Sequence, residues 1–227
     1  MKAPQPIGKK GSLKWIQILI NNCSHILDQH LLHNLKLDLE KIEWLSPLKK
    51  ERYAEYRDDD FLNLLGLEKF NEKLHDFWPK RGPQWDALGK GNEKGPYFLV
   101  EAKANIPEII SSSQAKSEKS ISRIKDSLFE TQKYLNCKSP LNWESGLYQY
   151  ANRIAHLYFL RCLCKVEAYM IFIYFLDDHT HIPTSKQEWT GAIYLQKQLM
   201  GLKRHKLQRY VVDVFLDVNE IDNRTSG

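Results

Sequence analysis

Cysteine and long hydrophobic runs are scarce in this sequence. The 227 residues include four cysteines, and none of the four stands in a CxxC pair or beside a histidine at the spacing of zinc ligands. Neither a disulfide framework nor a structural zinc site is therefore expected. The most apolar run, 168–176, is about half as long as a membrane-spanning helix requires, and acidic residues flank it at both ends.

The N-terminal region also lacks the pattern of a secretory signal. Its early lysines are followed only by the short apolar stretch from Trp15 to Ile20, which Gln17 interrupts. A signal peptide needs a longer uninterrupted apolar segment. Together with free cysteines, which are typical of a reducing compartment, this pattern predicts a cytoplasmic protein without a membrane segment.

Basic residues exceed acidic residues only slightly. Lysine and arginine number 33, aspartate and glutamate number 28, and the net charge is +5. An excess of this size fits a nucleic-acid-binding protein but is shared by many enzymes. The basic residues gather at 203–209 and at 80–81. No helix-turn-helix or zinc-finger motif accompanies them, so no base specificity is expected.

The hydrophobic pattern predicts helices and strands in mixed order. Helical spacing or dense charge indicates helices at 14–35, 49–57, 61–77, 124–135, 144–164 and 187–200. Apolar, β-rich stretches indicate strands at 85–88, 97–104, 167–176 and 210–218. The glycine-rich segment 89–96 is expected to link the first two strands as a hairpin loop, and the serine- and lysine-rich segment 111–122 to form a mobile loop.

This order predicts a single α/β domain in which helices flank a mixed central β-sheet. The strand at 167–176 is expected at the centre of the sheet because its apolar run is nearly continuous. Residues 1–60 are expected to form an N-terminal helical elaboration that packs on a core formed by residues 61–227. Three consecutive acids at 58–60 could suggest a metal cluster, but acids before a helix more often act as its N-cap, which is the preferred interpretation.

Three charged residues near the hairpin give the strongest chemical signal. Glu101 and Lys103 are two positions apart in an apolar strand, so they project from one face while Val100 and Ala102 project from the other. Asp86 lies in the preceding strand, where the hairpin brings its carboxylate beside Glu101. Only Glu101, among all acidic residues of the chain, has a lysine two positions later.

Such a cluster predicts a metal site. Two converging carboxylates repel each other unless a cation lies between them, and hard oxygen ligands with open water positions suit Mg²⁺ or Mn²⁺. The cation would polarise a phosphoryl oxygen and lower the pKa of bound water, and Lys103 would orient that water or neutralise developing negative charge. This chemistry indicates phosphodiester hydrolysis. The alternative interpretation is an exposed edge strand with a surface ion pair of little energetic value.

Asp86 followed by Glu101-Ala102-Lys103 resembles the D...ExK signature of the PD-(D/E)XK nuclease superfamily. Gln84-Trp85 departs from it where a proline would precede the aspartate. Segments 77–83 (FWPKRGP) and 148–153 (YQYANR) are similar to an uncharacterised bacterial branch of the superfamily, and the likeness extends over residues 61–218. The resemblance implies a restriction-endonuclease-like core, metal ligation by Asp86, Glu101 and the Ala102 carbonyl, and action of Lys103 on the attacking water.

Auxiliary candidates lie on the neighbouring helices. Gln149 and Arg153 belong to a polar stripe on the helix expected at 144–164, and they either face the site or form solvated surface. The superfamily often adds a glutamate from the first core helix, and the resemblance makes Glu72, or Glu68 one turn earlier, the candidate. Glu108 could reach the metal or cap the segment that follows the strand, and the cap is preferred.

The sequence therefore supports two functions of different kinds. The leading hypothesis is a Mg²⁺-dependent nuclease that acts on DNA or RNA. The alternative is a nucleic-acid-binding or interaction module of the same fold whose site is inactive or gated by a partner. A weaker third hypothesis is a metallohydrolase acting on a small phosphorylated ligand. Nothing in the sequence indicates the oligomeric state.

Overall fold

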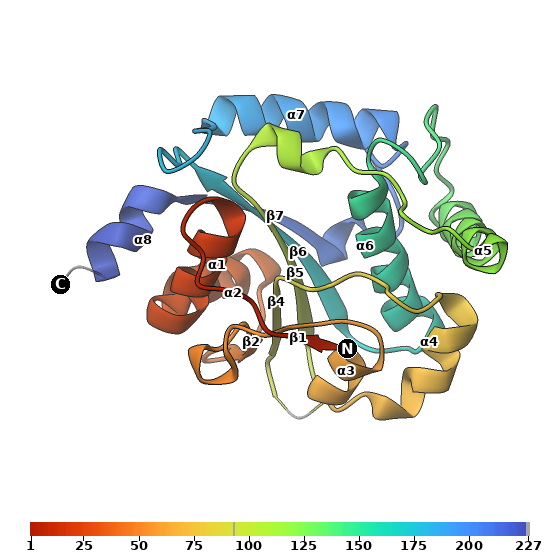
Figure 1. The fold of residues 1–227 in the computed structure, drawn as a ribbon, viewed down its shortest axis with the longest axis horizontal. Coiled ribbons are helices and arrows are strands. Elements are labelled where there is room, and N and C mark those ends of the chain that lie inside the picture. The colour runs from red at the N-terminus through yellow and green to blue at the C-terminus, as the bar shows by residue number, and fades with distance from the viewer. Residues whose placement is uncertain (93, 226–227) are drawn as a thin grey trace.

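A five-stranded mixed β-sheet forms the centre of the molecule in the computed structural model, which describes residues 1–92 and 94–225 (Figure 1). The strand order is β2 (Glu43–Ser46), β4 (Ala87–Lys90), β5 (Tyr97–Lys103), β6 (Ala168–Leu176) and β7 (Val211–Asp217). The pairs β2–β4 and β4–β5 are antiparallel, whereas β5–β6 and β6–β7 are parallel. The predicted α/β class with a mixed sheet is confirmed.

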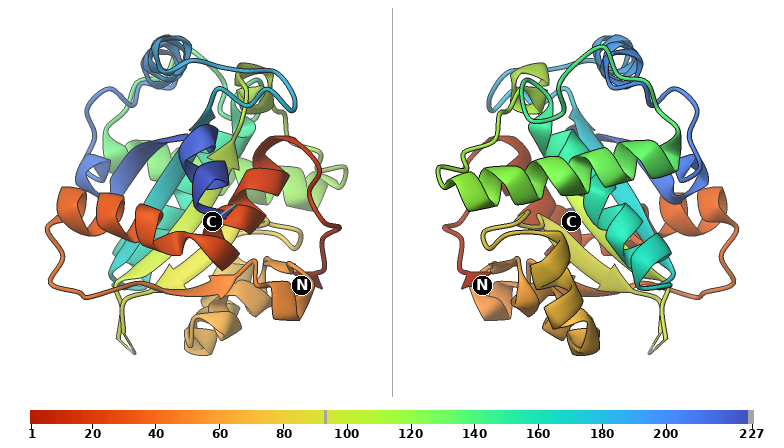
Figure 2. Two further views of the ribbon diagram at one scale, coloured as in Figure 1. Left: turned by 90° about the vertical axis from the view of Figure 1, so that its left-hand side faces the viewer. Right: turned by 90° about the vertical axis from the view of Figure 1, so that its right-hand side faces the viewer.

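Helices cover both faces of this sheet (Figures 1 and 2). One face carries α1 (Gly11–Asn22), α2 (Ser24–Leu35) and α8 (Val218–Thr225). The opposite face carries α3 (Asp59–Leu64), α4 (Asn71–Phe77), α5 (Glu118–Leu135), α6 (Tyr148–Tyr158) and α7 (Lys186–Leu199). Within the described ranges, no helix is long and apolar enough to cross a membrane.

Strand β6 explains why the sheet needs cover on both sides. Eight of its nine residues are buried, without the alternation of a half-exposed strand. A strand with a parallel partner on each side is shielded by helices above and below, so both of its side-chain rows are apolar. The expected central position of this strand is confirmed.

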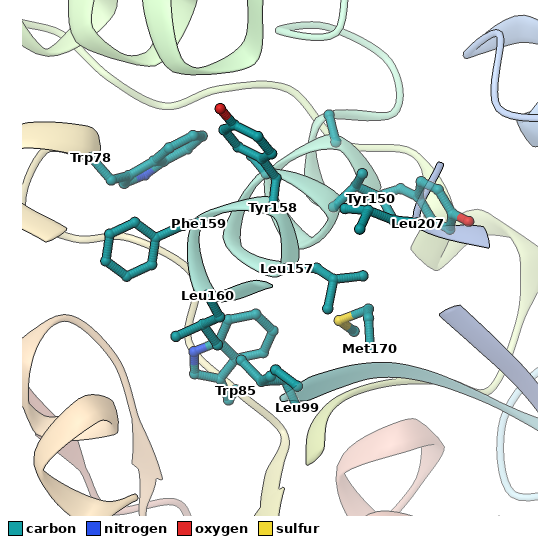
Figure 3. Packing of buried hydrophobic residues seen from close by; sticks show 14 of the residues in the cluster. Trp78, Trp85, Leu99, Tyr150, Leu157, Tyr158, Phe159, Leu160, Met170 and Leu207 are labelled. Carbon is teal, nitrogen blue, oxygen red and sulfur yellow. The ribbon is translucent and has the colours of Figure 1, made fainter. Parts of the chain in front are cut away.

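Strand β5 divides its residues between two hydrophobic cores. Val100, Ala102 and Ala104 pack in the core beneath α1 and α2. Leu99 packs in the core beneath α5 and α6, where Trp85 of the chain before β4 and Leu157 of α6 also lie (Figure 3). Because residues alternate along a strand, Glu101 and Lys103 share the side of Leu99.

Several predicted helices end earlier than expected. The helix expected at 14–35 is two helices, because the backbone at Cys23 (φ −146°, ψ 36°) leaves the helical region. The helix expected at 61–77 is divided around Gly66, which has a positive φ of 73°, and its end at Phe77 is as predicted. The helix expected at 144–164 is α6 followed by a wider turn at Phe159–Leu163.

The prediction of a helix at 49–57 is wrong. Only Lys49–Glu51 forms a short 3₁₀ turn, after which Arg52 and Tyr53 adopt positive φ angles that end it. Residues Glu55–Tyr56 then form β3, which pairs with β1 (Lys2–Ala3). Dense charge had predicted this helix, yet the segment has no apolar stripe to hold a helix on the core.

The segment 1–60 also contributes to the sheet itself. Its strand β2 was not expected, and it pairs with β4 through Trp44, opposite Gly89. Of the three acids at 58–60, Asp58 precedes α3 and Asp59 and Asp60 lie in its first turn, but the Asp58 side chain does not cap that helix. Its carboxylate accepts hydrogen bonds from the backbone N–H groups of Arg81 and Gly82. Asp58 therefore anchors the loop before Asp86 instead of acting as the expected N-cap.

Candidate active site

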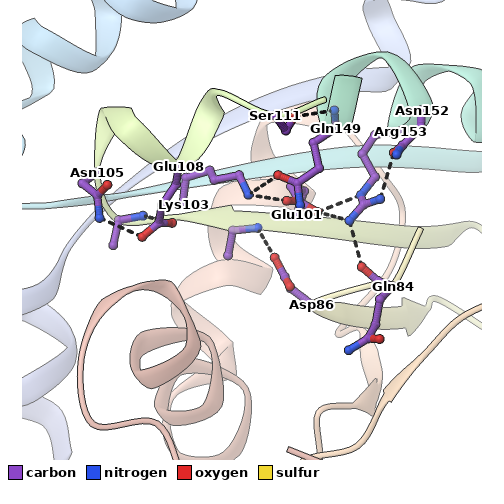
Figure 4. Close-up of polar contacts among 12 residues, drawn as sticks. Gln84, Asp86, Glu101, Lys103, Asn105, Glu108, Ser111, Gln149, Asn152 and Arg153 are labelled. Atoms are coloured by element: carbon purple, nitrogen blue, oxygen red, sulfur yellow. Dashed lines mark hydrogen bonds and ion pairs between the residues drawn. The ribbon is translucent and has the colours of Figure 1, made fainter. Parts of the chain in front are cut away.

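Asp86 and Glu101 lie opposite each other across the β4–β5 hairpin (Figure 4). Ala87 pairs with Val100, so the preceding residue, Asp86, faces Glu101. The backbone holds Asp86 on both sides: its N–H donates to the Val100 carbonyl at 3.2 Å, and its Oδ2 accepts from the Ala102 N–H at 2.7 Å. The structure therefore places the two predicted acids on neighbouring strands, near enough for the charge of Glu101 to act on Asp86.

Glu101 is the most deeply buried acid of this site, with 2% of its surface exposed. Its Oε1 accepts from Lys103 Nζ at 2.5 Å, and its Oε2 accepts from Arg153 Nε at 2.7 Å and Nη2 at 2.5 Å. Burial disfavours the carboxylate, but Arg153 and Lys103 outweigh burial and place the pKa of Glu101 below its ordinary value. Glu101 is therefore ionised, and both its oxygens have cationic partners.

Arg153 is the centre of this hydrogen-bond network. It is 3% exposed, and besides Glu101 its guanidinium donates to the Gln84 carbonyl at 2.8 Å and to Asn152 Oδ1 at 2.9 Å. Its guanidinium also lies 4.9 Å from the ring of Trp85. A buried guanidinium with this many partners has a fixed position. Arg153 therefore faces the site, and the alternative of a solvated surface position is wrong.

Lys103 is held between two side-chain oxygens. Its Nζ donates to Glu101 Oε1 and to Gln149 Oε1 at 2.9 Å. Burial disfavours the ammonium, but the Glu101 and Asp86 carboxylates outweigh burial and raise the pKa of Lys103. The side chain is therefore a fixed positive charge, and Gln149 faces the site through this contact.

Glu55 is a third carboxylate at this site and was not among the predicted residues. It lies on β3, is buried, and accepts from Gln84 Nε2 at 2.5 Å. Burial, followed by the charge of Glu101, raises the pKa of Glu55 to about 7 against the opposing effect of Gln84. Its sequence signal is slight, a single acid between the buried residues Ala54 and Tyr56 in a charged stretch.

The ionised form of the Asp86 carboxyl is strongly disfavoured at this site. Asp86 is only half-buried, yet its low-dielectric surroundings and the charges of Glu101 and Glu55 hold its pKa well above the ordinary value, against the attraction of Lys103. Three carboxylates thus face two cations, Lys103 and Arg153. The unbalanced negative charge favours either a bound proton or a bound cation.

A cavity of about 830 Å³ opens beside these residues. Asp86, Glu55, Gln149 and Arg153 contribute to its lining. Its other walls come from residues 78–84 and from 111–117, the first part of the segment 111–122 that was expected to be a loop. Residues 118–122 instead belong to α5, which Ser117 caps, so that part of the prediction is wrong. Its lining also includes a group of four further basic residues: Arg57, Lys80, Arg81 and Lys116.

Glu101 and Lys103 lie behind the surface of this cavity. They line a separate small cavity of about 10 Å³, and Gln149 borders both cavities. A molecule in the large cavity would therefore meet Asp86, Glu55 and Arg153 first. Of the three residues expected to form one cluster, Glu101 and Lys103 form an ion pair, whereas Asp86 is linked to them only through the effect of their charges on its pKa.

The remaining candidates have different positions. Glu72 lies on α4 and is not among the described residues that line the large cavity. Glu108 accepts hydrogen bonds from the Ala104 N–H and from the Asn105 side chain. It therefore caps the turn after β5, which was the preferred interpretation over a role at the metal. His156, one turn beyond Arg153, is enclosed by aromatic rings, and burial lowers its pKa to about 3.

The donor set restricts what kind of metal site is possible. Within the described part of the chain, no three histidine, cysteine, aspartate or glutamate side chains are arranged as a ready metal-binding group. Mg²⁺ commonly uses only one or two protein carboxylates and completes its coordination with water and substrate phosphate. The pair Asp86 and Glu101 fits that smaller requirement, and Asp86 Oδ1 accepts no hydrogen bond from the described residues.

Comparisons with protein-family models, with curated proteins and with solved structures find no match for this chain. The geometry and electrostatics of the site are therefore the basis for a functional proposal.

Proposed function

We propose that this protein is a metal-dependent nuclease of the PD-(D/E)XK type that hydrolyses phosphodiester bonds in DNA or RNA. The observation that carries the proposal is the position of Asp86 in the wall of a cavity with a basic lining, with the charge of Glu101 acting on it from behind that wall. Glu55 adds a third carboxylate, and the raised pKa values of Asp86 and Glu55 indicate negative charge that a cation would stabilise.

Asp86 and Glu101 would hold Mg²⁺ or Mn²⁺, with the Ala102 carbonyl as the further ligand that the family resemblance implies. Glu55 lies near enough to affect the charge of both acids and would support the same ion. When bound, such a cation polarises a phosphoryl oxygen and lowers the pKa of water. Lys103 and Arg153 would keep Glu101 ionised and hold it in place.

The cavity lining fits a polyanionic substrate. Arg57, Lys80, Arg81 and Lys116 surround an opening whose inner wall is acidic. Basic residues attract the phosphate backbone, and the resulting binding is weakened by salt. The loop carrying Arg81 is fixed by its backbone hydrogen bonds to Asp58. A volume of about 830 Å³ lies within the range of sites that enclose small ligands, which fits a few nucleotides of one strand.

One observation favours the alternative of a binding module without turnover. Both oxygens of Glu101 are already neutralised by Arg153 and Lys103, so a cation at Glu101 would compete with these partners. In that case the protein would bind nucleic acid at the same cavity without cleaving it. Salt-sensitive binding without cleavage in Mg²⁺ or Mn²⁺ would identify this function.

The nuclease proposal is tested with two substitutions in the site. Asp86→Asn keeps an oxygen that can accept from Ala102 but removes the charge, and Lys103→Ala removes the ammonium. We expect each variant to lose about 100-fold or more of the Mg²⁺-dependent cleavage of labelled single- and double-stranded DNA and RNA. Asp126→Asn, an exposed acid on α5, is the matched control. Equal cleavage by wild type and both site variants would refute the assignment.

A further inference from the structure

The small cavity behind Lys103 is lined by an unusual set of polar atoms. Its volume is about 10 Å³, and Tyr150, Tyr174 and Gln196 border it together with Lys103 and Gln149. The hydroxyls of both tyrosines and Oε1 of Gln196 are buried and have no hydrogen-bond partner among the described residues. Three such atoms around one cavity indicate a bound polar molecule, because buried polar groups are nearly always hydrogen-bonded.

The strand register places Tyr174 directly beside Lys103. Lys103 of β5 pairs with Tyr174 of β6, and Glu101 pairs with Phe172, so all four side chains lie on one face. Tyr150 of α6 stacks on Phe172 with ring centroids 4.4 Å apart, and both residues line the same cavity. Helix α6 and strands β5 and β6 therefore all contribute side chains to this cavity next to Lys103.

A second strand adds an acid to this region. Asp213 of β7 pairs with Phe172 of β6. Lys197 holds its Oδ2, whereas its buried Oδ1 has no hydrogen-bond partner among the described residues. Burial, and after it the Asp213 carboxylate, raises the pKa of both Tyr150 and Tyr174. Both phenols are therefore neutral and able to donate a hydrogen bond.

The size and charge of the cavity identify its occupant as water. A volume of about 10 Å³ is close to the minimum that one water molecule needs, and it is too small for phosphate or a nucleotide. A metal cation is disfavoured by the adjacent Lys103 ammonium. Water can accept from a tyrosine or from the third N–H of Lys103, which is left after its bonds to Glu101 and Gln149, and can donate to Gln196.

We propose that one ordered water occupies this cavity and connects Lys103 with Tyr150, Tyr174 and Gln196. The two tyrosines are then positioning residues, which act on the site through the water and Lys103 without touching substrate. The existence of the water does not depend on the proposed nuclease function, whereas its effect on catalysis rests on that function.

Whether removal of a tyrosine hydroxyl lowers or raises the melting temperature tests the presence of the water. If the hydroxyl of Tyr174 is bonded to water, Tyr174→Phe breaks a network and we expect the melting temperature to fall by about 2–4 °C. If the hydroxyl is buried without any partner, its removal raises the melting temperature and overturns the proposal. Tyr150→Phe is expected to behave in the same way, and the exposed Tyr194→Phe is the control that leaves the melting temperature unchanged.

Two further measurements separate the water from the nuclease function. A high-resolution crystal structure of the wild-type protein is expected to show one density peak between Lys103 and Tyr174, and an empty cavity overturns the proposal even where a variant fails to fold. If the protein cleaves nucleic acid, Tyr174→Phe is expected to lower kcat severalfold with an unchanged KM. An unchanged kcat overturns the positioning role. A protein without any cleavage refutes the nuclease function, and in that case the electron density alone shows whether the water is present.

Discussion

The two faces of the central sheet are built from the same strands but bury different kinds of residue. Towards α1, α2 and α8, strands β5 and β6 present Val100, Ala102, Ile171 and Ile173, and the packing is apolar. Towards α5 and α6, the intervening positions include Glu101 and Lys103, which pair with a buried arginine of α6. One face resembles an ordinary protein interior, and the other holds a charged network beside a cavity.

This contrast separates stability from function. Burying charges costs free energy that ion pairing only partly restores, so apolar residues of similar volume would stabilise the charged face equally or better. The charged network is therefore poorly explained by folding alone. Buried ionisable groups with shifted pKa values next to a cavity are typical of functional sites. Both faces contribute a hydrophobic core to the fold, and the charged face carries the proposed chemistry in addition.

The largest stability effect is expected from breaking the charged face at Arg153. Arg153→Met keeps much of the side-chain volume but leaves Glu101 buried with one partner fewer. We expect a loss of about 3–5 kcal/mol in the free energy of unfolding, measured by chemical denaturation.

The double variant Glu101→Gln/Arg153→Met separates lost charge pairing from lost packing. It removes one charge of each sign and leaves an amide oxygen for Lys103. We expect it to be less destabilised than Arg153→Met alone. A double variant that is as unstable as the sum of both single variants would contradict the view that the two charges compensate each other.

A smaller effect, on pH dependence, is expected from His156 on the same side of the sheet. The pKa of His156 is about 3 in the folded protein and about 6.5 in the unfolded chain. Between these two pH values only the unfolded chain binds the proton. The free energy of unfolding therefore receives the full contribution of the neutral His156 above pH 6.5. As the pH falls this contribution is lost, by about 2 kcal/mol at pH 5. We expect His156→Phe to remove that loss. Denaturation curves at pH 7 and pH 5 test this, and an unchanged pH dependence would exclude the buried neutral ring as its source.

The smallest effect is expected on the apolar face. Ile173→Val removes one methylene group next to Val214 of the same core. It should cost about 0.5–1.5 kcal/mol and leave cleavage unchanged at temperatures well below the melting transition. Denaturation and nuclease assays on the same preparation provide the measurement. A loss of activity as large as that of Lys103→Ala would show that the two faces are not functionally separate.

Much of the charged face could be predicted from the sequence because it depends on strand alternation. The apolar runs of β5, β6 and β7 are long enough to identify strands, and the two-residue period then places Glu101 and Lys103 on one face. The expected hairpin is present and brings Asp86 to the backbone N–H of Ala102, between Glu101 and Lys103 in sequence. The polar stripe on α6 left open whether Gln149 and Arg153 face the site or solvent, and only their contacts with Lys103 and Glu101 decide between the two.

The remaining parts depend on contacts between segments that are distant in sequence. Glu55 reaches the site only because the two-residue strand β3 pairs with β1 and Tyr56 bridges to Trp85, and neither pairing has a periodic signal. Strand β2 is four residues long and mostly polar at its ends, so its position beside β4 was not visible. The anchoring of the loop at Arg81 and Gly82 by Asp58 likewise needs the folded chain, because an acid before a helix ordinarily indicates a cap.

The central claim is that Asp86, in the wall of the basic cavity, and Glu101 behind it hold a divalent cation. Isothermal titration calorimetry with Mn²⁺ tests it most directly, because it detects the ion without requiring turnover or a known substrate. We predict that the wild-type chain binds a single Mn²⁺ and that Asp86→Asn, which preserves the hydrogen bond to Ala102, shows no measurable binding. Absence of binding by the wild type, or equal binding by Asp86→Asn, would contradict the account.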